Sequence, residues 1–324
     1  AREVGIHFPT TLLHDDLQNR DLTSHHDWIV KPHTGTGGLG IRSLADRRLS
    51  LRESSEAPTL SRSERRHTFA QSQLCPGEYL QQRIPGRPLG VNFISRLRDG
   101  KYQVKLLGAF AGLTHRKNRE HRWLYGGSIG PLLLHETISS NTQQNLSNLG
   151  NHIAKRFELV GLFNVDFIFT PDRRLVLLEI NPRYSASMEL MPTAGHLVDC
   201  HIAAYQEQAG QIDRQQADQR LAAIDQHVGD QPYGIACKRI VYATRPTRFD
   251  SSVEGLQTRV RDLSEPHAIE VTYHDIPSSD DLIPSGYPIL TIIARYQDAT
   301  TPSPAKDLIR QTHRIAARIR RMLG

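Results

Sequence analysis

The chain has 324 residues, of which 38% are hydrophobic and 23% charged, with a formal net charge of +6. This length predicts about two domains with ample core, and the composition excludes a protein that is disordered as a whole. The basic net charge suits anionic partners. The three cysteines are scattered, which predicts a reduced compartment. The sequence shows no membrane-spanning run or signal peptide, so we expect a cytoplasmic protein without a membrane partner.

The first predicted strand is the short apolar run Trp28–Pro32, which contains Lys31 next to its end. The loop that follows holds four glycines: Gly35, Gly37, Gly38 and Gly40. Glycines tolerate positive φ and let backbone N–H groups approach an anion closely, and Lys31 adds a positive charge beside them. The spacing fits neither a Walker loop nor a dinucleotide fingerprint. The segment predicts an anion-binding loop, with a plain hairpin connection as the alternative.

The next part of the chain contains a polar stretch and two strands. Arg42–Arg66 is charged and rich in serine, and it predicts a loop plus helix of the small lobe. Within and just after it, Arg62–His67 indicates a solvated face more than a nucleic-acid site. Leu89–Ile94 and Tyr102–Gly108 predict strands, and Asp99-Gly100 between them is a hairpin signal. Apolar residues at helical spacing over Thr142–Leu159 then predict an amphipathic helix that packs behind the following hairpin.

That hairpin is the most informative part of the sequence. Two apolar runs flank a short turn at Pro171–Arg174. Side chains alternate faces along a strand, so Glu179, Asn181 and Arg183 share one face, and Asp166 approaches them from the partner strand. Carboxylates and an amide oxygen suit Mg²⁺ that bridges phosphates, and a guanidinium suits a developing negative charge. The alternative is a two-stranded ribbon with a solvated polar face.

After the hairpin, the sequence predicts a helix from His196, a linker or solvated helix over 206–232, and several further strands. These strands are predicted at Tyr233–Ala243, Ile269–Pro277 and Tyr287–Tyr296. A final helix is predicted at Pro302–Leu323.

The lysine strand, its glycine loop and the later Asp…Glu-x-Asn hairpin resemble the ATP-grasp superfamily, in that family's order. Glu78–Pro88 is a third match, to the hinge that lines adenine, and the resemblance covers about residues 5–205. It implies an α+β fold in which two lobes clamp ATP. The predicted domains are a small lobe at 1–78, a large lobe with the metal site at 79–205, a linker at 206–232 and a C-terminal β-rich domain with a terminal helix at 233–324.

The resemblance also implies roles for single residues. Lys31 would hold the α- and β-phosphates, and Arg183 would stabilise the acylphosphate or the incoming acid. The phosphate lid would be formed by Gly35, Gly37, Gly38 and Gly40. The adenine hinge would be formed by Gln81, Gln82, Arg83 and Ile84. The ligands of Mg²⁺, or of Mn²⁺, would be Asp166, Glu179 and Asn181. Catalysis would rest on Lys31, Asn181 and Arg183.

Two features depart from the family pattern. Pro88 stands where many members have a ribose-binding acid, so the ribose contacts are expected elsewhere. No lysine precedes Lys31, and the segment from Gly5 to Thr10 resembles the entry just after the family's first phosphate-binding lysine. The preceding α/β domain is therefore expected to be absent. A truncated start, substitution by an arginine such as Arg2, and lost activity remain open explanations.

The activity implied is that of an ATP-dependent carboxylate–amine ligase, in which an acylphosphate forms with release of ADP and an amine then displaces phosphate. The motif from Asn181 to Glu189 is most similar to the carbamoyl-phosphate synthetase and biotin carboxylase side of the superfamily. Similarity to predicted carboligases of one-carbon cofactor synthesis implies an amino acid such as glutamate as substrate. The loop with His115, Arg116, Trp123 and Tyr125 would face the second substrate, with a plain surface loop as the alternative. A biotin-carboxylase-like carboxylase and an inactive nucleotide-binding protein are the rival functions, and a homodimer is left open.

Overall fold

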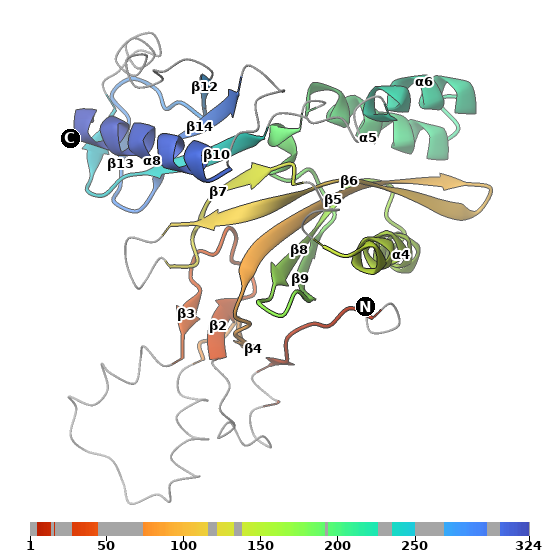
Figure 1. Ribbon diagram of the computed structural model, residues 1–324, viewed down its shortest axis with the longest axis horizontal. Helices are drawn as coiled ribbons and strands as arrows, with labels where there is room; N and C mark the ends of the chain where they lie inside the picture. The colour runs from red at the N-terminus through yellow and green to blue at the C-terminus, as the bar shows by residue number, and fades with distance from the viewer. Residues whose placement is uncertain are drawn as a thin grey trace, which may run out of the picture.

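The computed structural model describes residues 5–13, 16, 28–44, 74–115, 122–132, 138–191, 194–225, 235–249, 269–296 and 305–323. Within these residues the chain forms a four-stranded antiparallel sheet and an eight-stranded antiparallel sheet, with helices packed on the larger one. The smaller sheet lies at the bottom of Figure 1, and the larger sheet runs across its centre. This arrangement confirms the predicted α+β fold with two lobes.

The smaller sheet has the strand order β1-β4-β2-β3. Its strands are β1 (Thr11–Leu12), β2 (Trp28–Pro32), β3 (Arg42–Ser43) and β4 (Glu78–Gln82). One face buries an apolar cluster that consists of Leu12, Trp28, Val30, Leu44, Leu74 and Leu80. Because side chains alternate along a strand, Lys31 and its register partner Tyr79 point to the opposite face, away from this cluster.

The larger sheet has the strand order β12-β14-β10-β7-β6-β5-β8-β9. Its strands are β5 (Arg87–Arg98), β6 (Lys101–Thr114), β7 (Tyr125–Gly130), β8 (Gly161–Phe169), β9 (Leu175–Asn181), β10 (Ala236–Tyr242), β12 (Ile269–His274) and β14 (Pro288–Tyr296). The hairpin predicted at Asp99-Gly100 is confirmed: both residues have positive φ, at 49° and 71°, as a tight two-residue turn requires.

Helix α4 (Ser140–Phe157) covers one face of this sheet. The Ser139 hydroxyl caps its first turn by accepting a hydrogen bond from the Thr142 N–H at 3.2 Å. Leu146, Leu149 and Ile153 are buried in one core cluster with the sheet residues Phe93, Phe163 and Val165. The amphipathic helix predicted behind the hairpin is therefore confirmed.

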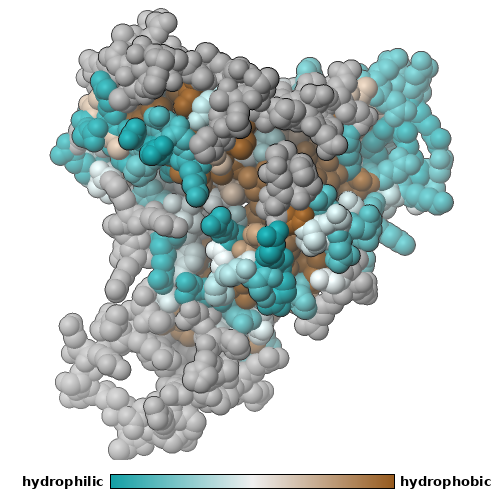
Figure 2. All heavy atoms as spheres, viewed as in Figure 1, coloured by the Kyte–Doolittle hydropathy of each residue, from teal (hydrophilic) through white to brown (hydrophobic). Residues whose placement is uncertain are grey.

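Two helices follow the hairpin, α5 (Ala194–Gln208) and α6 (Arg214–Asp225), and a 3₁₀ turn, η4 (Met188–Leu190), precedes them. The segment predicted as a linker or solvated helix over 206–232 contains α6, a helix that is exposed on one side. Its other side buries Ala217, Leu221 and Ile224 in a core cluster with α5. The segment has few large apolar side chains, but those three recur at helical spacing. Figure 2 shows that hydrophilic side chains cover the outer side of this end of the molecule.

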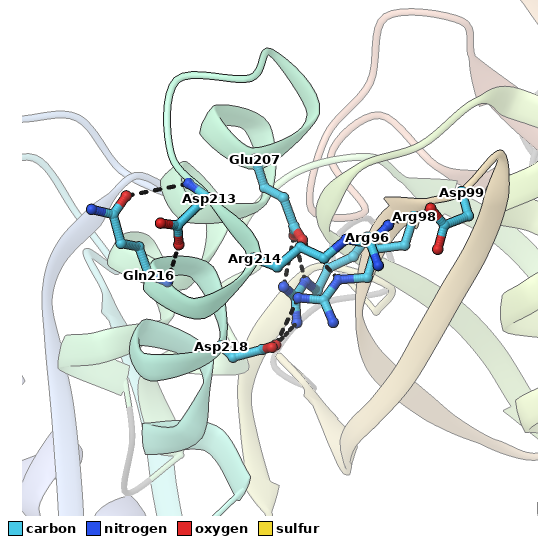
Figure 3. A network of polar contacts seen from close by, with 8 residues as sticks. All are labelled: Arg96, Arg98, Asp99, Glu207, Asp213, Arg214, Gln216 and Asp218. Atoms are coloured by element: carbon cyan, nitrogen blue, oxygen red, sulfur yellow. Dashed lines mark hydrogen bonds and ion pairs between the residues drawn. The ribbon is translucent and has the colours of Figure 1, made fainter.

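Ion pairs tie these helices to the tip of the β5–β6 hairpin (Figure 3). The Nε atoms of Arg96 and Arg98 each donate to Glu207 of α5, at 2.8 and 2.7 Å. The same two guanidinium groups also donate to one oxygen of Asp218 on α6, at 2.8 and 2.7 Å. An exposed pair between Asp99 and Arg214 lies beside them. We call the four residues Arg96, Arg98, Glu207 and Asp218 the arginine cluster.

The C-terminal part of the chain continues the large sheet. Strand β10 pairs with β7 on one side and with β14 on the other, so the sheet runs across the boundary predicted between residues 205 and 233. Helix α8 (Ala305–Met322) packs on β10 and β14 through Ile315 and Ile319. A two-stranded ribbon, β11 (Thr247–Arg248) with β13 (Leu282–Ile283), completes this part. Among the described helices, none has the length and apolar character needed to cross a membrane.

Candidate active site

The predicted carboxylates lie opposite each other on the hairpin of β8 and β9, with Asp166 in register with Glu179. The register shifts after this pair, because Phe167 pairs with Leu177 and leaves Leu178 as an extra residue. This bulge explains how Leu177 packs on the core cluster while Glu179, only two residues away, is exposed on the other face. Strict alternation would have placed both side chains on one face.

The surroundings of Asp166 disfavour the charged form of its carboxylate. Burial and the negative charge of Glu179 raise its pKa to about 6, although a hydrogen bond from Asn181 and the charges of Arg183 and Lys31 act in the opposite direction. Like charges directly opposite each other on neighbouring strands are destabilising. The pair therefore presents negative charge that its protein surroundings balance only in part.

Lys31 brings a positive charge to this pair from the smaller sheet. Burial lowers the pKa of Lys31, while the charges of Glu179 and Asp166 oppose that shift. Its neighbour Tyr79 is also within electrostatic reach, since burial and the charge of Glu179 raise the Tyr79 pKa. The face of the small sheet that carries Lys31 and Tyr79 is thus directed at the hairpin, and the site lies between the two lobes.

Asn181 joins the carboxylates to Arg183. Its Nδ2 atom donates to Asp166 Oδ2 at 3.0 Å, and its Oδ1 atom accepts from Arg183 Nη2 at 3.3 Å. In this arrangement the amide oxygen predicted to bind a metal faces the guanidinium of Arg183. Lys31, Asp166, Glu179, Asn181 and Arg183 nevertheless lie in one site, as the sequence predicted for residues about 150 positions apart.

A buried polar network behind Asp166 was not predicted. Asn164 Nδ2 donates to Asn92 Oδ1 at 3.0 Å, and Asn92 Nδ2 donates to Ser187 Oγ at 3.1 Å. Ser185 Oγ also donates to Asn92 Oδ1, at 3.0 Å. Asn92 is fully buried in an otherwise apolar part of β5, and a polar residue in such a run is the one signal that the sequence offered. Buried amide groups need hydrogen-bond partners. The network therefore holds β5, β8 and the segment Ser185–Ser187 together beside the site.

The glycine loop is docked onto strand β7. Gly37, Gly38 and Gly40 have positive φ, at 59°, 81° and 77°, as expected for the predicted loop. The Tyr125 N–H donates to the Gly37 carbonyl at 2.7 Å. A Cβ atom at Gly38 would lie 2.0 Å from the Trp123 carbonyl oxygen, so only glycine permits this approach. The loop is therefore held above the region that the sequence assigned to the second substrate. Of that region, Arg116 lies outside the described residues.

The predicted hinge connects the two lobes. Gln81 and Gln82 end β4, and the chain then passes through Arg83 and Ile84 to Gly86, where β5 begins at the next residue. Gly86 has φ 153°, and a Cβ atom there would lie 2.4 Å from the Ile168 side chain. The hinge therefore packs closely against β8 at Ile168 and Phe169.

A cavity of about 550 Å³ lies at this hinge. It is lined by His7, Phe8, Gln82, Ile84, Pro85, Thr170, Pro171, Asp172, Arg174 and Val176. Val176 is the register partner of Ile168, two residues from Asp166, so it belongs to the face of the hairpin that carries the carboxylates. The cavity is therefore at the turn end of the same face.

Comparison with known protein families agrees with this geometry. The profile of one family, described as an ATP-grasp domain, matches residues 2–187, which include the glycine loop, the hinge and the hairpin. A sequence comparison with curated proteins gave no match.

Solved structures with the same fold cover nearly all of the chain. An N5-carboxyaminoimidazole ribonucleotide synthetase in complex with ADP has 13% identity and a TM-score of 0.56, over 99% of this chain and 70% of that one. A carboxyaminoimidazole ribonucleotide synthase from Aspergillus clavatus, complexed with ATP, has 14% identity and a TM-score of 0.59, over 98% and 71%. Pyruvate carboxylase of Rhizobium etli has 15% identity and a TM-score of 0.56, over 100% of this chain and 27% of that one. At these identities the likeness shows the fold alone.

Proposed function

Because this chain belongs to the ATP-grasp family, we propose that it is an ATP-dependent carboxylate–amine ligase that acts through an acylphosphate. One observation carries the proposal: Asp166 and Glu179 face each other between the lobes, and Lys31 of the small sheet is within electrostatic reach of both. Two opposed carboxylates whose negative charge is only partly balanced by nearby positive groups are suited to a metal ion. A lysine beside them is suited to the phosphates that the metal would bridge.

The residues present fit Mg²⁺ better than a metal held by protein alone. Among the residues that the structure describes, no group of three or more His, Cys, Asp and Glu side chains is placed to hold a metal. Mg²⁺ commonly uses one or two carboxylates and completes its shell with phosphates and water. Asp166 and Glu179 would hold it, with Asn181 orienting Asp166 through the hydrogen bond at 3.0 Å. When bound, the metal would neutralise phosphate charge.

The nucleotide would lie along the face between hinge and hairpin. We infer that the base and ribose occupy the hinge end, where the cavity is lined by Gln82, Ile84 and Val176. The phosphates would extend toward Lys31 under the docked glycine loop, whose N–H groups suit an anion. Arg183 lies beyond Asn181, at the end where the acid would meet the terminal phosphate.

The proposed reaction needs no side-chain nucleophile. A carboxylate oxygen of the substrate attacks the γ-phosphorus, and the bond to the β,γ-bridging oxygen breaks to release ADP. The amine nitrogen then attacks the acyl carbon, and inorganic phosphate and a proton leave. Lys31 and Arg183 would stabilise the charge that develops on the transferred phosphoryl group. An amino acid such as glutamate is the carboxylate proposed, and bicarbonate is the second candidate, because two structural neighbours are named for a carboxyamino product.

The test is to incubate the chain with Mg-ATP and a pool of amino acids, polyamines, tyramine and bicarbonate, and to follow ADP, AMP and new masses by mass spectrometry. ADP with a condensation product is expected. Glu179→Gln should lower the rate by about a hundredfold or more, because it removes one charge from the metal site. Asp199→Asn, an exposed carboxylate on α5, is the matched control and should leave the rate unchanged. AMP in place of ADP would contradict the acylphosphate route.

A further inference from the structure

A partly buried ion pair lies outside the site residues described so far. Lys238 on β10 donates from its Nζ atom to Glu189 Oε2 at 2.7 Å. The Lys238 side chain is only 5% exposed, whereas that of Glu189 is 36% exposed. Within the part of the chain that the structure describes, the second carboxylate oxygen of Glu189 has no hydrogen-bond partner. Lys238 thus holds one carboxylate oxygen from the buried side. The Glu189 side chain as a whole remains partly accessible.

The position of Glu189 is fixed by a second cation. Arg295 on β14 donates from Nη1 to the Leu190 carbonyl and from Nη2 to the Glu189 carbonyl, both at 2.8 Å. The short 3₁₀ turn η4 is thereby pinned to the sheet at its backbone, while Lys238 fixes the side chain. A charged group that is oriented by one buried and one half-buried cation is pre-organised for a ligand.

Several contacts place this carboxylate beside the proposed reaction centre. Lys238 is the register partner of Ser128 on β7, and the Ser128 hydroxyl lies 2.6 Å from the Tyr125 hydroxyl. Burial raises the Tyr125 pKa, and the charges of Glu189 and Asp166 add to that shift, so Tyr125 is within reach of both carboxylates. The Tyr125 backbone in turn holds the glycine loop through Gly37.

Glu189 is also close to the other end of the site. The charge of Glu189 adds to the effect of burial in raising the Tyr184 pKa, and the Tyr184 carbonyl accepts a hydrogen bond from Arg183 Nη1 at 3.2 Å. Glu189 therefore lies between the Arg183 end of the hairpin and the β7 strand under the glycine loop. This is the region that the sequence assigned to the second substrate, since Tyr125 belongs to it.

We propose that Glu189 binds the amine of the acceptor substrate through the carboxylate oxygen that Lys238 does not hold. This inference rests on the proposed function and narrows it: the acceptor presents an ammonium or amine N–H group, and not a carboxylate or phosphate, toward β7 and η4. Because Lys238 holds one oxygen of this carboxylate, the role of the other oxygen is to position and select the amine. Charge-assisted hydrogen bonds of this kind are short and strong.

The test measures binding, so it does not depend on turnover. The melting temperature of the chain with Mg-ADP is recorded with ammonium, putrescine, spermidine and tyramine, and with the N-acetylated form of each organic amine. At least one amine should raise the melting temperature beyond the value with Mg-ADP, and its acetylated form should not. Titration should show that Glu189→Gln weakens that amine by about ten- to a hundredfold, with the affinity for Mg-ADP unchanged.

Two further variants separate a binding role from a structural one. Asp199→Asn removes an exposed carboxylate on α5, away from Lys238 and Arg295, and it should change neither affinity. Glu189→Asp keeps the charge and should recover part of the amine affinity. Three results would each overturn the amine site. Glu189→Gln could lose Mg-ADP binding, or it could keep the wild-type affinity for the amine. Alternatively, the wild-type chain could bind Mg-ADP but none of the amines. In the last case the proposed nucleotide site would still stand, whereas failure of the wild type to bind Mg-ADP would overturn both.

Discussion

Two groups of carboxylates, one on helices α5 and α6 and one on the β8–β9 hairpin, have their charge balanced in different ways. In the arginine cluster, Glu207 accepts from Arg96 and Arg98, and its side chain is 7% exposed. On the β8–β9 hairpin, Asp166 instead faces a second carboxylate, and its pKa rises to about 6. The first group completes its hydrogen bonds within the fold and joins two helices to a hairpin. The second leaves negative charge available, which is the property that a metal and phosphate site needs.

The largest effect on stability is expected from breaking the balanced group. Glu207→Gln removes the charge that two largely buried guanidinium groups share, with Arg96 and Arg98 side chains 12% and 17% exposed. Loss of one partner from a buried pair leaves an uncompensated charge, so the free energy of unfolding should fall by roughly 3 kcal/mol. Urea denaturation measures this.

ATP turnover of Glu207→Gln at temperatures below its transition should be normal, the reverse of the result expected for Glu179→Gln. A Glu207→Gln variant that is as stable as the wild type would show that the cluster contributes nothing to the docking of α5 and α6.

Removing a charge from the carboxylate pair Asp166 and Glu179 should stabilise the chain, whereas Glu207→Gln destabilises it. Asp166→Asn removes a charge that the folded chain disfavours, so without ligand it should raise the free energy of unfolding by roughly 1–3 kcal/mol. The folded-state pKa of about 6 lies above the unfolded value near 4, so the folded state binds more protons between these values. Wild-type stability should therefore decrease as pH rises from about 4 to 6, and the penalty should be complete above pH 6.

The measurement is the difference in melting temperature between wild type and Asp166→Asn across this pH range, with and without Mg-ADP. The difference should grow with pH in the absence of ligand. Mg-ADP should stabilise the wild type far more than the variant. A difference that is independent of pH would contradict the electrostatic account of Asp166.

The sequence predicted the hairpin and its carboxylates because alternation and a short turn are local signals. It could not place the bulge at Leu178, which depends on how Phe167 and Leu177 pack on the core. It also missed the network around Asn92, since amide and hydroxyl partners from distant strands are decided by tertiary structure.

The same limit applies to charges. Lys238 and Glu189 are 49 positions apart, and no spacing rule links a strand lysine to a 3₁₀ turn. The long-range relation of the predicted site residues, Tyr125 included, was predicted through the family resemblance. The contact between Lys238 and Glu189 is one that only the structure shows.

A smaller effect is expected at the exposed edge of the arginine cluster. The Asp218 side chain is 55% exposed, and hydrogen bonds from Arg96 and Arg98 lower its pKa. Solvent screens such a group, so Asp218→Asn should cost less than about 1 kcal/mol, with Glu207 still holding both arginines. Chemical denaturation at low and high salt should show a loss that shrinks as ionic strength rises. A cost equal to that of Glu207→Gln would mean that burial does not set the difference.

The smallest effect is expected at the pair next to this cluster. Arg214 and Asp99 are 61% and 72% exposed, and both lie at ends of elements, one in the first turn of α6 and one in the β5–β6 turn. Ion pairs this exposed contribute about 0.5 kcal/mol or less, because side-chain entropy and solvent offset the attraction. Arg214→Gln should therefore leave the urea midpoint nearly unchanged, at any salt concentration. If it destabilised the chain as much as Asp218→Asn does, exposure would not rank these ion pairs, and proximity to the buried arginines would have to be the cause.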